Sequence, residues 1–233
     1  MSKFAKILLI AQITDGQTAT YEYDGVDTIY VPSPYDTIEK SRLINIGASR
    51  VKTPYFWMND ADIVVPFQEA IGQVNHRSPF YLPYRFFIYL DEEETTEYIS
   101  KGTVRTKRTE TNMQAFAGGF IANKDEFMKL GGMDEKYVGW GYEDTELAER
   151  VQRFSRYEIL DALIGAHLYH NPSHGDMEGR AEANRGTFIR NRPLLKMNVE
   201  RYFGKIKSPF INRKFLSSHE LLQKIKSGQV SKA

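Results

Sequence analysis

The sequence predicts an α/β protein with a mostly parallel sheet flanked by helices. Two patterns predict this fold class. Within residues 6–58, short apolar runs bounded by turn residues alternate with a segment of helical periodicity, which is typical of βαβ units. The chain of 233 residues is also long enough for one ordinary hydrophobic core, and its 14 tyrosines and 14 phenylalanines suit a folded protein that contacts ligands. Ligands of such folds bind at the carboxyl ends of the strands, so the residues after each strand are the first candidates for function.

The elements of the N-terminal half alternate between strand and helix. Strands are predicted where short apolar runs end at turn residues. The spacing of four apolar residues predicts a helix before the third strand, and we expect these residues to point mostly inward. The expected elements are strands at residues 6–13, 27–31 and 55–58, and a helix from about residue 36 to Pro54 with Ile38, Leu43, Ile46 and Val51 inside.

The rest of the chain predicts further helices and strands. Glu143 and Asp144 open a helix whose apolar stripe should be buried and whose charged residues should be wetter. The acidic residues 91–94 should start a solvated helix without chemistry of its own. The remaining expectations are helices at residues 67–74 and 180–203, the latter interrupted at Pro193, strands at residues 80–89, 157–160 and 162–169, and a stripe of Leu147, Val151 and Phe154 with Glu146, Glu149 and Arg150 outside it.

Two carboxylates, Asp60 and Asp62, directly follow the third expected strand. On extended backbone the side chains alternate with period two, so both carboxylates would lie on one side. Two convergent oxygen donors suit a divalent cation that carries phosphates, whereas the alternative is a solvated turn after an edge strand. Charges after such an apolar strand are costly unless matched, which favours the cation site.

A glycine-punctuated aromatic segment precedes the helix that starts at Glu143. Its residues Trp140 and Tyr142 offer flat apolar surfaces on which sugars and bases can stack. The helix dipole alone would account for Glu143 and Asp144, because acidic residues are common at helix N-termini. The aromatic neighbours favour a binding site instead.

Several of these segments resemble the β-1,4-galactosyltransferases and the bacterial chondroitin polymerase-type enzymes, which are glycosyltransferases of the GT-A fold. The order and spacing of the matching parts follow the family pattern. The parts are Gly118-Gly119-Phe120, Leu130-Gly131-Gly132-Met133, Trp140-Gly141-Tyr142-Glu143-Asp144, the block from Asn45-Ile46-Gly47 to Asp62, and Gly165-Ala166-His167-Leu168-Tyr169-His170-Asn171-Pro172. The resemblance implies a single GT-A domain over residues 1–203 and a basic C-terminal tail over residues 204–233.

The resemblance also implies the reaction. A metal-dependent, inverting glycosyltransferase would move a sugar from a nucleotide-diphosphate sugar, with UDP as the expected nucleotide, to a hydroxyl group of a saccharide or another acceptor. The implied roles are general base for Asp144, substrate binding for Trp140, Tyr142 and Glu143, and close backbone approach to the donor for Gly118 and Gly119.

A metal site is implied by the same resemblance. Asp60, Asp62 and His170 would hold Mn²⁺, with Mg²⁺ as an alternative, since an imidazole beside oxygen donors shifts the preference towards Mn²⁺. His167 and His174 would be supporting or incidental histidines.

The sequence departs from the family pattern where the nucleotide would bind. One residue is missing from the matching stretch, so either Lys40 or Arg42 takes the place of the nucleotide-contacting arginine. The arginine-bearing loop after the first strand is replaced by residues 13–20 (ITDGQTAT). The polar residues 101–112 form either a loose surface loop or a mobile lid over the diphosphate. The candidate lid residues are Arg105, Lys107 and Arg108.

Composition bears on the metal chemistry, the cellular location and the charge distribution of the protein. The chain has no cysteine, which excludes disulfides and thiolate metal sites. Its apolar runs are too short to span a bilayer and its start lacks the apolar stretch of a signal peptide, so we expect a cytoplasmic enzyme without a transmembrane segment. The net charge of +1 hides a basic quarter, because residues 180–233 hold 13 basic and 3 acidic side chains.

Three alternatives to a saccharide-directed transferase stay open. The basic quarter could bind nucleic acid, with a modified base in DNA as the acceptor, although pairing with the acidic body accounts for the charge as well. A metal-dependent nucleotidyltransferase would also use Asp-x-Asp on a βαβ scaffold, but it would not need the Trp-Gly-x-Glu-Asp segment. A non-catalytic sugar-binding module would need neither the metal residues nor Asp144.

Overall fold

The computed structural model describes residues 6–14, 24–84, 86–103, 111–112, 116, 118–160, 163–171 and 177–202. Within these ranges, side chains are described except at residues 86–87, 111–112, 177–178 and 192–202. Some of the expectations lie outside the described residues and stay predictions. They concern His174, the candidate lid residues Arg105, Lys107 and Arg108, and the division of the chain into residues 1–203 and 204–233.

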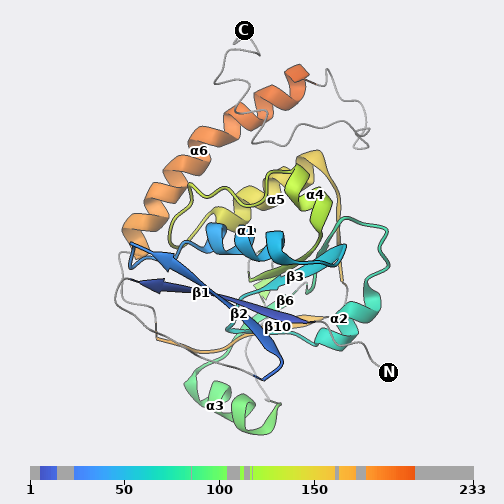
Figure 1. Cartoon of the computed structure of the whole chain (residues 1–233), viewed down its shortest axis with the longest axis vertical. Helices are drawn as coiled ribbons and strands as arrows, with labels where there is room; N and C mark the ends of the chain where they lie inside the picture. Colours follow the sequence, from blue (N-terminus) through green and yellow to red (C-terminus); the bar gives the residue numbers. More distant parts are fainter. Residues whose placement is uncertain are drawn as a thin grey trace.

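The predicted α/β class is confirmed, because strands and helices alternate along the described chain (Figure 1). The strands are β1 (Ile7–Thr14), β2 (Val26–Ser33), β3 (Tyr55–Asn59), β4 (Ile63–Val64), β5 (Phe80–Leu82), β6 (Phe86–Tyr89), β7 (Thr111–Asn112), β8 (Gly119–Asn123), β9 (Tyr157–Ile159) and β10 (Ile164–His167). The helices are α1 (Lys40–Arg50), α2 (Phe67–Gln73), α3 (Glu92–Lys101), α4 (Lys124–Lys129), α5 (Glu143–Phe154) and α6 (Met177–Tyr202).

The described strands form three sheets with mixed pairing, whereas the sequence predicts a mostly parallel sheet. One sheet pairs β1 with β2 in parallel, and the other two have the strand orders β4-β10-β6-β7 and β3-β8-β5-β9. The pairs β10–β6 and β5–β9 are parallel, but β8 runs antiparallel to both β3 and β5. Apolar runs predict where strands lie, whereas the direction of each strand depends on its connections, which the pattern does not encode.

Two of these pairings bring distant segments together. β3 pairs with β8 so that Asn59 lies opposite Gly119, which sets the Asp-x-Asp segment beside the glycine pair. β10 pairs antiparallel with β4 so that His167 lies opposite Ile63. The two registers therefore gather the end of β3, the start of β8 and the end of β10 in one region.

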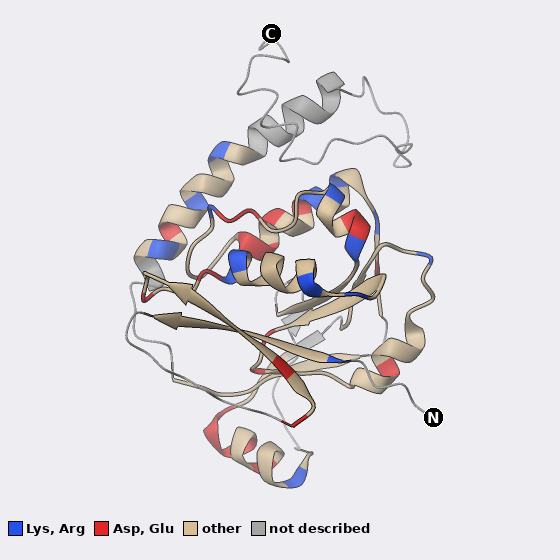
Figure 2. Ribbon diagram, viewed as in Figure 1, with Lys and Arg blue, Asp and Glu red and all other residues tan. Residues whose placement is uncertain are grey.

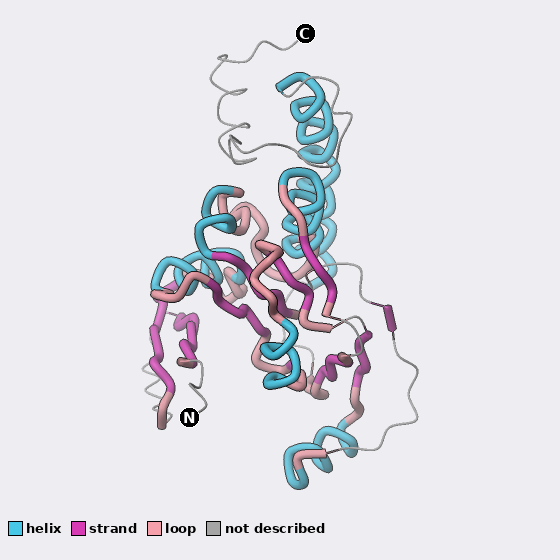
Figure 3. The backbone as a smooth tube through the Cα atoms, turned by 90° about the vertical axis from the view of Figure 1, so that its right-hand side faces the viewer, coloured by secondary structure: helices cyan, strands magenta, loops and turns pink. Residues whose placement is uncertain are grey.

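The largest part of the core lies between β8 and the helices α4 and α5. Phe120, Phe127, Leu147 and Val151 are fully buried in one hydrophobic cluster, and Phe154 is nearly so, which confirms the predicted apolar stripe of α5. In two perpendicular views, α6 projects from one end of the molecule and α3 from the other (Figures 1 and 3). None of the helices in the described part of the chain is long and apolar enough to cross a bilayer.

The polar face of α5 differs from the prediction that Glu146 and Arg150 are wetter. Both side chains are buried, and their charges pair at 2.5 Å between Arg150 Nη2 and Glu146 Oε2. Arg150 Nη1 also donates hydrogen bonds to the carbonyl oxygens of Leu130 and Gly132. The turn that follows α4 therefore covers this face of α5, and periodicity within α5 could not show that.

Three smaller expectations also need correction. Residues 80–89 form two strands in different sheets, because Pro83 lies between them and cannot donate a ladder hydrogen bond. Ile38 precedes α1 and is 52% exposed instead of pointing inward. α6 continues through Pro193, since the fixed φ of proline is itself helical and one lost hydrogen bond need not end a long helix.

Candidate active site

The end of β3 and the start of β8 meet through their backbones. The amide of Asp60 donates a hydrogen bond of 2.8 Å to the carbonyl oxygen of Gly118. Gly118 has a φ of +76°, and a Cβ atom there would lie 2.0 Å from Ile63 Cδ1 and 2.7 Å from the Tyr84 hydroxyl. Only glycine fits this corner. The close packing beside the Asp-x-Asp segment therefore depends on the predicted glycine pair.

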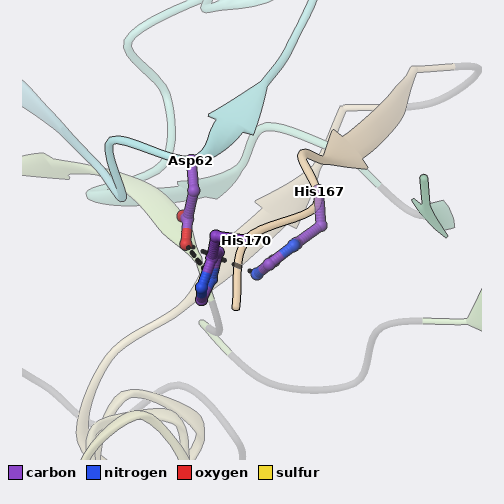
Figure 4. A group of neighbouring side chains, drawn as sticks. All are labelled: Asp62, His167 and His170. Atoms are coloured by element: carbon purple, nitrogen blue, oxygen red, sulfur yellow. Dashed lines mark ion pairs between the residues drawn. The ribbon is translucent and has the colours of Figure 1, made fainter. Parts of the chain in front are cut away.

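Asp62, His167 and His170 form a cluster in which one potential ligand atom of each side chain lies within 4.8 Å of the others. Figure 4 shows the carboxylate of Asp62 directed at both imidazoles. Its Oδ2 atom lies 3.4 Å from His167 Nε2 and 3.1 Å from His170 Nε2. The amide of Leu168 donates to the carbonyl oxygen of Asp62 at 2.8 Å, which anchors the histidine segment to the residue after β3.

The donor set of this cluster fits a divalent transition metal. One carboxylate oxygen and two imidazole nitrogens suit Mn²⁺ or a similar ion better than Mg²⁺, which prefers oxygen alone. His170 Nδ1 lies 3.0 Å from the carbonyl oxygen of Asn171. When Nδ1 carries the proton and donates to that oxygen, Nε2 keeps its lone pair towards Asp62. The structure thus brings together two of the predicted ligands, Asp62 and His170, and adds His167.

Asp60 lies apart from this cluster. Its Oδ2 atom accepts a hydrogen bond of 2.7 Å from Lys40 Nζ. The prediction that the two carboxylates share one side assumed extended backbone, but the chain leaves the extended conformation after Asn59 and turns before β4. A metal role for Asp60 therefore stays a prediction, and its partner in this structure is Lys40.

Lys40 connects Asp60 to the start of α5. Its Nζ atom also lies 3.7 Å from Glu143 Oε1. Burial by itself would lower the pKa of Lys40, but the charges of Asp60 and Glu143 outweigh it and raise the pKa, so the ammonium stays charged. The other candidate for nucleotide contact, Arg42, pairs instead with Glu39 at 2.8 Å on the outer side of α1.

The two predicted carboxylates of α5 have different surroundings. Glu143 is 5% exposed, and its Oε2 atom has no hydrogen-bond partner among the described residues. Burial raises the pKa of Glu143, and the negative charge of Asp144 raises it further, which outweighs the attraction of Lys40. Asp144 is only half-buried, and its Oδ1 atom accepts hydrogen bonds from the amide and the hydroxyl of Thr145. Of the two, Asp144 is the carboxylate that an incoming molecule can reach more easily.

The glycine-punctuated loop before α5 presents Trp140 to solvent. Trp140 is 61% exposed, as a stacking platform must be. The amide of Gly139 donates a hydrogen bond of 2.9 Å to the carbonyl oxygen of Ile38, which holds the loop beside the start of α1. Tyr142 differs from Trp140 because its ring packs against Phe188 of α6, with the ring centroids 5.5 Å apart.

Two residues of this region were missed or undervalued in the sequence. His167 was expected to be a supporting or incidental histidine, although its spacing of three residues from His170 could have indicated a pair. Tyr84 was not considered at all. Burial raises the pKa of the Tyr84 hydroxyl, and the negative charges of Asp60 and Asp144 contribute, so this phenol stays neutral.

Basic residues of the C-terminal quarter lie along the described half of α6 (Figure 2). Arg185 pairs with Glu182 at 3.4 Å on an exposed surface. The Cγ atom of Arg180 would lie 3.4 Å from a Cβ atom at Gly139. These contacts do not test a nucleic-acid partner, which stays a prediction.

The sequence comparison identifies the family to which the central segment is similar. Residues 102–170 match the family described as the N-terminal domain of galactosyltransferase. The matched residues include the glycine pair, Trp140, Glu143, Asp144 and the histidine segment up to His170. The predicted resemblance is therefore confirmed over this segment, and the match supports a glycosyltransferase. No curated protein matches the sequence.

Comparison of structures finds distant similarities. A crystal structure of GalNAc-T7 with UDP, GalNAc and Mn²⁺ is 13% identical over 88% of this chain and 46% of that chain, with a TM-score of 0.49. This chain thus spans about half the length of that protein. A Drosophila β1,4-galactosyltransferase 7 variant with manganese, UDP-Gal and xylobiose is 15% identical, over 69% of this chain and 67% of that chain, with a TM-score of 0.43. The catalytic domain of the same enzyme with xylobiose is 12% identical, over 77% and 79%, also with a TM-score of 0.43.

Proposed function

We propose that this chain is an inverting glycosyltransferase that moves a sugar from a nucleoside-diphosphate sugar, with UDP as the expected nucleotide, to an acceptor hydroxyl. The observation that carries the proposal is the position of Asp144. It lies inside the galactosyltransferase-like segment and directly follows Glu143. Lys40 lies 2.7 Å from Asp60 and 3.7 Å from Glu143. This geometry supports one site that joins the candidate base to the residues after β3.

Asp62, His167 and His170 are the residues that would hold Mn²⁺, with Asp60 as a further ligand if it turns away from Lys40. A divalent ion bound there would act as a Lewis acid for the departing diphosphate. Lys40, which pairs with Asp60, would then pair with phosphate oxygens.

The acceptor side of the site is formed by α5 and the loop before it. Trp140 would stack on an acceptor sugar, and Asp144 would accept the proton of the acceptor hydroxyl. The hydroxyl oxygen then forms a bond to the anomeric carbon while the bond from that carbon to the diphosphate oxygen breaks. The nucleoside diphosphate leaves with the electron pair, and attack from the opposite face inverts the configuration. Thr145, which donates two hydrogen bonds to Asp144 Oδ1, would hold that carboxylate in place.

The buried Glu143 suits a supporting role better than proton transfer. Its carboxyl lies beside Lys40 and is 5% exposed, so an acceptor hydroxyl reaches it less easily than Asp144. A catalytic base must come within hydrogen-bonding distance of the proton it removes, directly or through one water molecule. This difference between two adjacent carboxylates makes the assignment testable.

The test compares Asp144→Asn with Glu149→Gln, a matched change of a carboxylate to an amide farther along α5. A panel of UDP-sugars is incubated with Mn²⁺ and saccharide acceptors, and the released nucleotide is identified. We expect the Asn variant to lose about 10²–10⁴-fold in transfer rate while it keeps Mn²⁺ and UDP binding. The Gln control should retain its rate.

Different outcomes exclude different parts of the proposal. Wild-type turnover in the Asp144→Asn variant would refute the role of Asp144. Release of pyrophosphate from a nucleoside triphosphate and a sugar 1-phosphate, without release of UDP from any UDP-sugar, would indicate a nucleotidyltransferase. Absence of turnover with every donor, together with sugar binding, would indicate a non-catalytic module.

A further inference from the structure

The N-terminal half of α6 packs against the loop that presents Trp140. A Cβ atom at Gly139 would lie 3.3 Å from the Cβ of Arg180, and one at Gly141 would lie 3.7 Å from the Cβ of Ala181. Both glycines have positive φ values, +77° and +101°, so the loop is sharply bent where the helix covers it. This part of α6 lies beyond the residues that match the galactosyltransferase family.

One buried amide ties the loop to the helix. Asn184 is 4% exposed, and its Nδ2 atom donates hydrogen bonds of 3.2 Å to the carbonyl oxygens of both Val138 and Trp140. These carbonyl groups lie on either side of Gly139, so one side chain fixes both ends of the first bend. A buried polar group with its donors fully used in this way specifies a single backbone arrangement.

A second contact from the same face of α6 reaches the first turn of α5. Phe188 lies four residues after Asn184, which places the two side chains on one face of the helix. Phe188 is 7% exposed, and its ring packs against Tyr142, which directly precedes Glu143 and has a φ of +69°. The helix thus contacts the loop on both sides of Trp140.

We propose that Asn184 is a positioning residue for the acceptor. By holding the carbonyl groups of Val138 and Trp140, it fixes the loop backbone that carries the exposed indole of Trp140, four residues before Asp144. The inference rests on the proposed glycosyltransferase function, in which Trp140 stacks on the acceptor. Asn184 touches neither reactant in this role. Its loss should therefore affect acceptor binding and leave donor and metal binding intact.

The variants are Asn184→Asp, which keeps the shape but cannot donate to carbonyl oxygens, and Asn184→Ala. Glu182→Gln is the control, because it changes charge on an exposed face of the same helix. We expect both Asn184 variants to raise the acceptor KM about tenfold, the effect of losing hydrogen bonds of ordinary strength. The donor KM, the affinity for Mn²⁺ and UDP, and the values of the control should stay those of the wild type.

A second measurement does not require activity. The chain contains two tryptophans, so in a Trp57→Phe background the tryptophan fluorescence, excited selectively over that of tyrosine, comes from Trp140 alone. The Trp57 Nε1 atom has no hydrogen-bond partner among the described residues, and the ring stacks on Phe67, so phenylalanine should be tolerated. Removal of the Asn184 amide should lower the fluorescence anisotropy of Trp140, whereas Glu182→Gln should not.

The two measurements separate the possible failures. If the wild type transfers no sugar but the anisotropy falls in the variants, the proposed function is wrong, whereas the role of Asn184 in holding the Trp140 loop is supported. If the anisotropy and the acceptor KM match those of the control, Asn184 does not position the loop. The proposal would also be overturned if donor affinity and kcat fell by the same factor by which the acceptor KM rose, because this would show a general structural role. If Asn184→Asp does not fold, Asn184→Ala is read by the same criteria.

Discussion

Replacement of Arg150 by methionine should strongly destabilise the fold, because it leaves a charge and two carbonyl groups without their partner. Arg150 is 2% exposed, and it donates hydrogen bonds to both carboxylate oxygens of Glu146, at 2.6 and 2.5 Å. It also donates to the carbonyl oxygens of Leu130 and Gly132, at 2.8 and 2.6 Å. The side chain of methionine has no hydrogen-bond donor, so it cannot replace Arg150 as the partner of the carboxylate and the two carbonyl oxygens.

The expected size follows from the burial. Breaking one partner of a buried ion pair costs about 3–5 kcal/mol, since the remaining charge stays desolvated. For a domain of this size, 1 kcal/mol corresponds to about 2–4 °C in Tm, so Arg150→Met should lower Tm by about 6–20 °C. The double variant Glu146→Leu/Arg150→Met removes the stranded charge and should recover part of the loss. It should not recover all of it, because the carbonyl groups of Leu130 and Gly132 still lack a donor.

The matched control is Arg153→Met on the same helix. Arg153 pairs with Glu149 at 2.6 Å with the same spacing, but its side chain is 23% exposed. Because solvent reaches this partly exposed pair and screens it, it should contribute only about 0–1 kcal/mol, so Tm should fall by at most about 4 °C. Thermal unfolding followed by circular dichroism measures all the variants. Equal shifts for Arg150→Met and Arg153→Met, or a double variant less stable than Arg150→Met, would refute the reasoning.

Two further predictions concern the metal cluster and the buried carboxyl. His167→Ala and His170→Ala should each weaken Mn²⁺ binding by about tenfold or more in a calorimetric titration. The control variant His76→Ala should bind Mn²⁺ as the wild type does. Unchanged binding in the His167 variant would show that His167 is not a metal ligand. Glu143 has a raised pKa in the folded state, so the folded state gains stability relative to the unfolded state as pH falls through that pKa towards 4.5. Glu143→Gln should accordingly have a higher Tm than the wild type at neutral pH, and this advantage should shrink on acidification; an advantage that is independent of pH would contradict the assignment.

The strands and the apolar stripe of α5 could be predicted from the sequence because they depend on local periodicity. Leu147 and Val151 are fully buried as predicted. The burial of Glu146 and Arg150 could not be predicted in the same way, because the groups that satisfy Arg150 lie in the turn after α4. A charged pair four residues apart looks the same in a sequence whether water or backbone carbonyls surround it.

The parts of the candidate site that lie in recognisable sequence motifs could be predicted. Asp62 and His170 were expected in one site and lie 3.1 Å apart. His167 was not expected as a ligand, because its orientation depends on the antiparallel pairing of β10 with β4. The contact of Asp60 with Lys40 depends on the turn after β3, whereas the prediction assumed extended backbone there. Residues that act through tertiary pairing were therefore the ones missed.

The pairing of Asp60 with Lys40 also reconciles two expectations that conflict at first sight. Lys40 was one of two candidates for the nucleotide, yet at 2.7 Å from Asp60 its charge is already compensated. Asp60 was a candidate metal ligand, yet it lies outside the cluster of Asp62 and the two histidines. Rotation of Asp60 towards a bound cation would release the ammonium group of Lys40 to the phosphates. Because like charges about 4 Å apart repel by about 1–4 kcal/mol, depending on solvent exposure, a diphosphate should bind weakly beside Asp60, Asp62 and Asp144 until a cation has bound first.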